Sequence, residues 1–321
     1  MSRLFVPVDL YRPIIEYVSE KRDLSALCAV SKSFQLEAER PLYREARLTG
    51  HAACLFSFSH AILSNSRLGP LVISLTMPSR TESGADCALL AVLMSRTLKS
   101  LSNLNALFIA NSHFLIAQPF LRPIDLLGSH FHLDTFGLRS GSLSLSALVP
   151  FLLTQPEITY LKYDHRTQEG GDAFTHHVDL LPRLSRLCLC VWQILPYFHR
   201  RPIARLCLKN IALSLDAFPK MVAVLAIFSK TLTHLSLELS EEGFFATASY
   251  PMPCLVMLLS RIQENLPQLK FLRLSGEVVL VCSPPARDAV RNTNLPRRIS
   301  GTKISRRFSI VYQKCRHSRH L

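Results

Sequence analysis

Three cysteines near the middle of the sequence have the spacing best suited to chemistry. Cys188 and Cys190 are two positions apart, and Cys207 falls in the next segment of the same pattern. Because adjacent strands of a sheet lie about 4.8 Å apart, we expect Cys188 and Cys207 to be cross-strand neighbours on an exposed face. Two thiols so placed could bind a metal ion or form a redox linkage. The alternative, which we favour, is that these cysteines are small apolar fillers.

Other residue types that occur in metal sites and active sites give weaker indications of function here. The twelve histidines include His130 and His132 as well as His165, His176 and His177, but their spacing does not predict the convergent ligands of a zinc site. Gly137–Gly141 is one residue short of a nucleophile elbow and is better explained as a turn. With only 11 glycines, a phosphate-binding loop is not expected either. The sequence therefore predicts no metal site, no cofactor and no enzymatic activity.

A repeated apolar pattern predicts the elements that would position these residues. It consists of an apolar residue, two others, a second apolar residue, one other and a third apolar residue, in a chain with 56 leucines. The eight occurrences are Leu68–Leu71–Ile73, Leu104–Leu107–Ile109, Leu133–Phe136–Leu138, Ile158–Leu161–Tyr163, Leu184–Leu187–Leu189, Ile203–Leu206–Leu208, Leu232–Leu235–Leu237 and Leu269–Leu272–Leu274. Their starting residues lie 19 to 37 positions apart, and leucine-rich repeats have a period of about 20–29 residues.

The pattern predicts a strand at each occurrence, with the last two apolar side chains on the same, inner face. Helical periodicity between the strands is seen in Ala88–Leu98, Leu145–Leu153, Met221–Phe228 and Leu255–Leu266. We therefore expect an α/β fold. Over residues 49–282 it would be a degenerate leucine-rich-repeat solenoid, with parallel strands on the concave face and helices outside.

The same register predicts which side chains lie on the concave face. They are Phe108, Arg139, Lys162, Asp164, Lys209, Glu238 and Arg273, with Trp192 just beyond a strand. Aromatic and arginine side chains are enriched at interfaces, and the mixed charges indicate a protein or peptide target rather than a polyanion. The identity of that target cannot be read from the sequence.

The first 48 residues have a different pattern, typical of three short helices. Leu10, Ile14, Ile15 and Val18 recur at spacings that predict one face of a helix, and Pro13 fits only in the first turn of that helix. Asp23 is expected to be the N-cap of a second helix, and a third carries Phe34 and its neighbours at four-residue spacing. Helices this short must pack together or against a partner.

These helices resemble an F-box, in particular the F-box-like module that precedes leucine-rich repeats in many fungal-type proteins. The resemblance is carried by Val6-Pro7-Val8-Asp9-Leu10, Ile14-Ile15-Glu16-Tyr17-Val18, Asp23-Leu24, Leu27, Val30-Ser31-Lys32 and Pro41-Leu42-Tyr43. It implies docking onto a Skp-family adaptor and cullin scaffold, with the repeats binding a target protein for an SCF-type ubiquitin ligase. The implied adaptor-facing residues are Val6, Pro7, Leu10, Ile14 and Ile15, whereas Leu24, Leu27, Val30 and Leu42 would divide between the module core and the interface.

Two alternatives to this interpretation remain. The N-terminal helices could merely cap the repeat array of a protein-interaction scaffold unconnected with a ligase. A weaker one is a nuclear, nucleic-acid-associated protein that acts through its basic C-terminal tail.

The net charge of +14 comes largely from residues 283–321, which hold ten Lys or Arg and one acidic residue. We expect this tail to be disordered, with nuclear import or weak nucleic-acid attraction as its possible function. Few aromatic residues accompany its basic ones, so specific nucleic-acid binding is not expected.

Composition also bounds the compartment of the protein. The longest apolar runs have 8 residues, whereas a membrane span needs roughly 20. Nine cysteines at irregular spacing do not resemble a disulfide framework. We expect a reduced cytosolic or nuclear protein without a membrane partner.

Overall fold

The fold is α/β, with parallel strands that alternate with helices. The computed structural model describes residues 7–48, 52–77, 86–110, 131–139, 145–164, 176–177, 179–211, 217–240, 259–281 and 303–313. The chain forms two compact units, Met1–Leu187 and Cys188–Leu321.

The first unit begins with a helical head made of η1 (Val8–Leu10), α1 (Tyr11–Glu16), α2 (Lys21–Cys28) and α3 (Lys32–Arg44). Ile15, Leu24 and Ala38 form the head's core, and the rings of Tyr11 and Phe34 stack with centroids 4.0 Å apart. This arrangement buries one apolar stripe from each helix, as short helices require.

The helix boundaries of the head differ from the sequence prediction at one point. Pro13 lies in the first turn of α1, as expected. The N-cap predicted at Asp23 is wrong, because α2 already begins at Lys21 and Asp23 lies within its first turn. A true cap occurs on α3, where the Ser31 hydroxyl accepts a hydrogen bond of 3.2 Å from the Phe34 amide.

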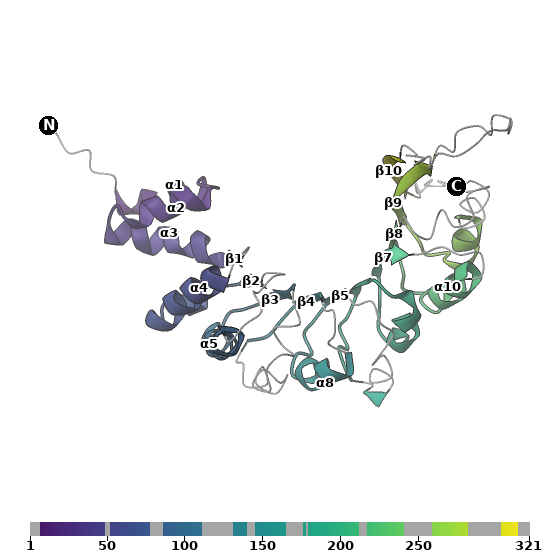
Figure 1. The fold of residues 1–321 in the computed structure, drawn as a ribbon, viewed down its shortest axis with the longest axis horizontal. Helices are drawn as coiled ribbons and strands as arrows, with labels where there is room; N and C mark the ends of the chain where they lie inside the picture. The colour runs from purple at the N-terminus through teal and green to yellow at the C-terminus, as the bar shows by residue number, and fades with distance from the viewer. Residues whose placement is uncertain are drawn as a thin grey trace, which may run out of the picture. The chain divides into compact units, whose positions relative to one another are not determined.

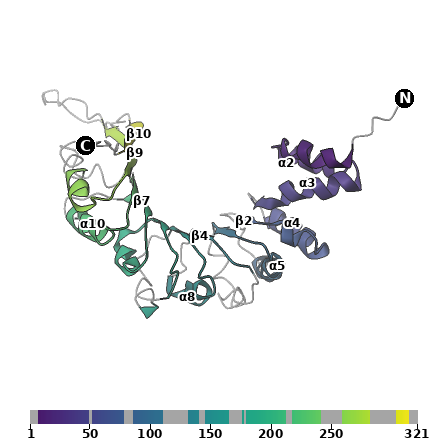
Figure 2. The ribbon, with the colours of Figure 1, turned by 180° about the vertical axis from the view of Figure 1, so that it is seen from behind.

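Strands β1 (Glu45–Arg47), β2 (Ser74–Met77), β3 (Ala106–Ile109), β4 (Thr135–Arg139) and β5 (Tyr160–Asp164) follow the head. They pair in parallel and in chain order. The connecting elements include α4 (Ala52–Ser64), η2 (Gly69–Leu71), α5 (Asp86–Ser100) and α8 (Leu145–Leu153). Helices α4, α5 and α8 lie on the same side of the strands (Figures 1 and 2), so none of these helices covers the opposite face of the strands.

The second unit continues the alternation of strands and helices. Its strands are β6 (Arg186–Leu189), which spans the boundary, β7 (Arg205–Ile211), β8 (His234–Leu239), β9 (Phe271–Val281) and β10 (Lys303–Gln313). Between them lie η3 (Trp192–Phe198), α10 (Ala217–Ala226) and helical residues 259–265. Strands β7, β8 and β9 are parallel, whereas β10 is antiparallel to β9.

A recurring backbone hydrogen bond defines the repeat register. The Asn105 carbonyl accepts from the amides of Asp134 at 2.9 Å and Thr135 at 3.1 Å. The equivalent carbonyls of Ile73, Asp134, Thr159, Ala204 and Thr233 each accept two amides of the next strand in the same way. In each of these repeats, the residue after the first apolar residue therefore holds its strand in register with the next strand through this carbonyl.

The predicted inner positions are buried in seven of the eight occurrences. The first occurrence is wrong: Ile73 is 39% exposed and Leu71 belongs to η2. The equivalent triplet is Val72–Leu75–Met77, whose members are at most 4% exposed. The sequence misleads here because the helical turn at η2 carries apolar residues at the same spacing as the strand that follows it.

The tail expected to be disordered contains an ordered strand. Residues 303–313 form β10 and pair along their whole length with β9, from Lys303 opposite Val281 to Gln313 opposite Phe271. An antiparallel partner satisfies backbone groups that the last parallel strand would otherwise leave unpaired. The other residues of 283–321 lie outside the described part of the chain.

Candidate protein-interaction surfaces

Helix α1 and the residues that flank it carry apolar side chains on two faces. One face, with Tyr11, Ile15 and Val18, packs into the core of the head. The other consists of Leu10, Ile14 and Tyr17, which are 49%, 43% and 91% exposed. We call these three residues the α1 stripe. Their spacing of four and three residues places them on one helical face.

The structure separates the predicted adaptor-facing residues into two groups. Pro7, Leu10, Ile14 and Val30 are exposed, and Val30 is 64% accessible. Ile15 and Leu24 are 2% and 3% exposed and belong to the core of the head. Ile15 therefore does not face outward as expected, and Leu24 falls on the core side of the division expected for it. Consecutive residues of a helix point in different directions. Ile15 faces the core of the head, and the adjacent Ile14 faces outward.

Four other residues complete this comparison. Leu27 and Leu42 are partly buried and pack against the head's core. Val6 lies outside the described residues. Tyr17 was missed in the sequence, although its position seven residues after Leu10 indicates membership of the same face.

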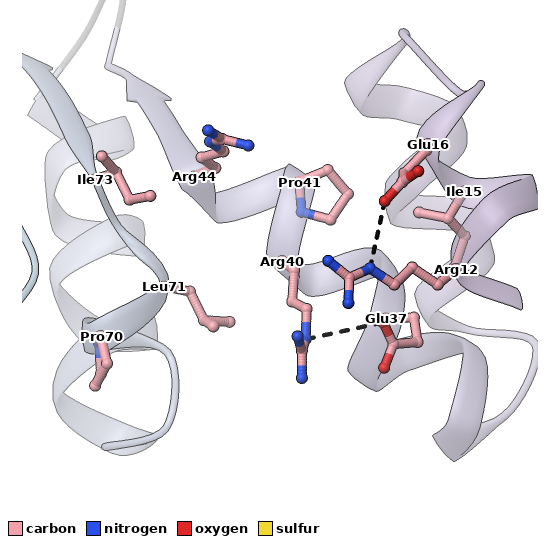
Figure 3. A pocket seen from close by; sticks show the side chains of 10 residues that line it. All are labelled: Arg12, Ile15, Glu16, Glu37, Arg40, Pro41, Arg44, Pro70, Leu71 and Ile73. Atoms are coloured by element: carbon pink, nitrogen blue, oxygen red, sulfur yellow. Dashed lines mark hydrogen bonds and ion pairs between the residues drawn. The ribbon is translucent and has the colours of Figure 1, made fainter. Parts of the chain in front are cut away.

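A pocket of about 380 Å³ separates α1 and α3 from the segment Pro70–Ile73. Figure 3 shows two ion pairs on its wall, between the Arg12 Nε and Glu16 Oε1 atoms at 3.3 Å and between the Arg40 Nε and Glu37 Oε2 atoms at 3.8 Å. Each carboxylate is thus paired with an arginine of its own helix. This arrangement offers an apolar floor with a charged rim rather than an acid–base pair.

A buried carboxylate joins the head to the strands that follow it. Glu39, on α3, is 5% exposed; it forms an ion pair with Arg67 and accepts a 2.7 Å hydrogen bond from the Gln35 Nε2 atom. Burial, and then the charge of Glu39, raise the pKa of the Cys28 thiol. The same causes raise the pKa of Tyr43. The thiol and the phenol are therefore held in their neutral forms beside the charge pair.

The strand face opposite α4, α5 and α8, which is open among the described residues of the first unit, brings together four predicted target-binding residues. Phe108 is opposite Gly137 on β4, and Gly137 is opposite Lys162 on β5, so these residues form one cross-strand row. A side chain at Gly137 would approach the Phe108 Cε1 atom to 2.8 Å, which shows how closely the ring covers the glycine. In the next row, the Arg139 Nε and Asp164 Oδ2 atoms form an ion pair at 3.7 Å.

A polar cluster at the amino ends of these strands was missed in the sequence. The Asp134 Oδ1 atom accepts a 2.7 Å hydrogen bond from the Thr159 hydroxyl, and Arg186 lies 3.9 Å from its Oδ2 atom. The Arg186 guanidinium also lies 5.3 Å from the centroid of the Tyr160 ring. Asp134 and Thr159 each lie one residue before a strand, and Tyr160 and Arg186 are the first residues of theirs, so the strand register could have predicted this cluster.

The other four predicted target-binding residues lie in the second unit. Arg273 and Glu238 are exposed on β9 and β8, and Lys209 is partly exposed on β7. Trp192 is partly buried at the start of η3. In one cross-strand row, Cys207 is opposite Ser236 and Ser236 is opposite Arg273.

The predicted neighbourhood of Cys188 and Cys207 is present in this unit. Strands β6 and β7 are adjacent, and a hydrogen bond joins the two thiols. This bond, with help from Lys209 and Ser236 and against burial and Glu238, lowers the pKa of Cys207 to about 7. Cys190 lies nearby, with its sulfur 4.0 Å from the Asn210 Nδ2 atom.

The described residues also bear on metal binding and membrane insertion. In this part of the chain, no three His, Cys, Asp or Glu side chains converge in a way that would hold a metal ion. No described helix has both the length and the apolar character needed to cross a bilayer. His132, His176 and His177 are exposed, whereas His130 and His165 lie outside the described residues.

No protein-family model matches this chain, and no curated protein matches its sequence. The function must therefore be argued from the surfaces described above.

Proposed function

We propose that the chain is a non-enzymatic substrate receptor of an SCF-type ubiquitin ligase. Its head is an F-box-like module that binds a Skp-family adaptor, which in turn is held by a cullin scaffold. The strand–helix repeats are a degenerate leucine-rich-repeat array that binds a target protein in the cytosol or nucleus. The receptor contributes proximity, because it holds the target close to a ubiquitin-charged enzyme that performs the transfer.

The observation that carries this proposal is the α1 stripe. The head already has a complete core around Ile15, yet Leu10, Ile14 and Tyr17 remain in solvent on an adjacent face of the same helix. Apolar side chains clustered on one face of a small module are typical of a protein interface. The resemblance of these residues to an F-box supplies the kind of partner.

The combination of aromatic, positive and negative side chains on the strands supports the proposal that the repeats bind a target protein. Phe108 offers an aromatic surface, Lys162 a cation, and the Arg139–Asp164 pair both signs of charge. In the second unit, Arg273 and Glu238 again combine both signs. Such a surface matches a folded protein or peptide with its own mixed charges.

Co-purification with a Skp-family adaptor tests the proposal. The wild-type chain should retain the adaptor, and Ile14→Asp should lose it because a carboxylate would be buried at the interface without a partner. Leu89→Asp is the matched control, because Leu89 is an exposed leucine on α5, 57% accessible and outside the head. Loss of the adaptor from both variants, or its absence from the wild type, would contradict the proposal.

A second candidate is a scaffold whose head only caps the repeats. It is favoured by the continuity of α3 with β1, since Arg44 ends the helix and Glu45 begins the strand. Under this alternative the α1 stripe has no partner, so Ile14→Asp should change neither binding nor stability.

A further inference from the structure

Two thiols of the second unit lie on the strand face opposite its inward-pointing leucines, which we call its open face, and the proposed function does not use them. Cys188 is on β6 and Cys207 on the adjacent β7. Neighbouring strands lie about 4.8 Å apart, within the Cα separation of about 4.4–6.8 Å that disulfides span. The two sulfurs are already close enough to share a hydrogen bond.

The environments of the two thiols differ in a way that assigns them separate roles. Cys188 is 4% exposed, whereas Cys207 is partly accessible from the open face. Cys207 also has the Ser236 hydroxyl and the Lys209 ammonium beside it, which favour a negative charge there, whereas burial and the charge of Glu238 oppose it. A reagent from solution therefore reaches Cys207 first, whereas Cys188 is buried next to it.

We propose that Cys207 and Cys188 form a peroxide-sensitive dithiol, in which Cys207 is oxidised first and Cys188 resolves it to a disulfide. This inference does not depend on adaptor binding. It assigns a modification site to the cross-strand row in which Cys207 lies with Ser236 and Arg273.

The chemistry balances with hydrogen peroxide as the oxidant. The Cys207 thiolate attacks one peroxide oxygen, the O–O bond breaks, and hydroxide leaves and is protonated to water, so that Cys207 becomes a sulfenic acid. The Cys188 sulfur then attacks the Cys207 sulfur, an S–S bond forms, the S–O bond breaks, and a second water leaves with the thiol proton. The two sulfurs are oxidised by two electrons in total, and peroxide is reduced to water.

The lowered pKa of Cys207, about 7, sets the expected rate. At neutral pH about half of Cys207 is thiolate, against about one part in a hundred for a thiol of ordinary pKa 9.0. A thiolate of lower pKa is intrinsically a weaker nucleophile, which cancels part of this gain. We expect Cys207 to react roughly fivefold faster than an exposed cysteine such as Cys54 at pH 7.

Peptide-resolved mass spectrometry of the full-length chain tests this inference. After brief treatment with hydrogen peroxide and blocking of free thiols with a maleimide, a disulfide between Cys188 and Cys207 should accumulate and disappear on addition of dithiothreitol. Cys188→Ser should stop at the sulfenic acid of Cys207, which dimedone traps. Cys207→Ser should form neither product, and Cys54→Ser, the control on α4, should behave as the wild type.

Either of two results would overturn the assignment. One is oxidation of Cys207 no faster than that of Cys54. The other is a disulfide that joins Cys207 to Cys190 while Cys188 remains free. Circular dichroism of each variant before oxidation verifies that the serine substitutions leave the fold intact. Loss of the adaptor in the co-purification above would not affect these readouts.

Discussion

The head and the repeat array differ in how completely they bury their apolar side chains. In the array, the inner positions of the strands are almost completely buried; Leu107, Phe136 and Leu161, for example, are 0% exposed. In the head, α1 buries Ile15 but leaves neighbouring Ile14 43% exposed. The array therefore uses its repeated leucines for its own core, whereas the head has apolar side chains in excess of what its core can hold.

This difference shows that apolar periodicity alone does not separate core from interface. Both regions have residues at helical or strand spacing, and both form the predicted elements. Only the burial of each residue shows whether an apolar stripe is covered by the chain itself or left exposed. The following substitutions are ordered by the size of the effect expected from that difference.

Truncation of a leucine should be costly in the array and nearly neutral in the α1 stripe. Leu161→Ala should lower the free energy of unfolding by about 2–5 kcal/mol, because it leaves a cavity between the sheet and its helices. Leu10→Ala should change it by less than about 0.5 kcal/mol, since the side chain is half exposed. Urea unfolding followed by circular dichroism measures both. Equal losses would show that the stripe belongs to the core.

The stability of the junction between the head and the repeat array should depend on the buried charge of Glu39. Glu39→Ala removes the partner of Arg67 and of the Gln35 amide and should cost about 1.5–3 kcal/mol. Arg67 is 41% exposed and can regain water, so the loss should stay below that of a fully buried pair. Chemical denaturation measures it, with Glu37→Ala as the control because Glu37 is a more exposed acid on the same helix. A similar loss in both variants would contradict a special role for Glu39.

The open face should be sensitive to crowding at Gly137. A methyl group there would collide with the Phe108 ring, so Gly137→Ala should cost about 1–3 kcal/mol. In a Phe108→Ala background the same change should cost much less, because the obstacle is gone. A double-mutant cycle measured by urea unfolding gives this coupling. Additive effects would mean that the ring does not rest on the glycine.

Much of the fold could be predicted because the repeat imposes a short, local rule. Apolar residues two apart, such as Leu235 and Leu237, predicted a strand and its inner face, and both are buried. The rule failed at Ile73, because a helical turn at η2 mimics the same spacing. It also gave no indication of β10, because Lys303–Gln313 lacks the repeated apolar triplet and pairs with the preceding strand β9 in the antiparallel direction.

The candidate sites were predictable only in part, since they depend on contacts between segments. The pairing of Cys188 with Cys207 followed from strand register, which is local information. The burial of Leu24 and the ion pair between Glu39 and Arg67 depend on how three helices and a later loop pack together, which no spacing within one segment encodes.

Hydroxyl-radical footprinting of the full-length chain with and without a Skp-family adaptor tests the central proposal most directly. Tyr17, 91% exposed, should be labelled strongly in the free protein and at least about fivefold less in the complex. Leu10 and Ile14 should be protected with it, and Leu89 should be unchanged. A complex in which Tyr17 stays as reactive as in the free chain, or an adaptor that does not bind at all, would contradict the account.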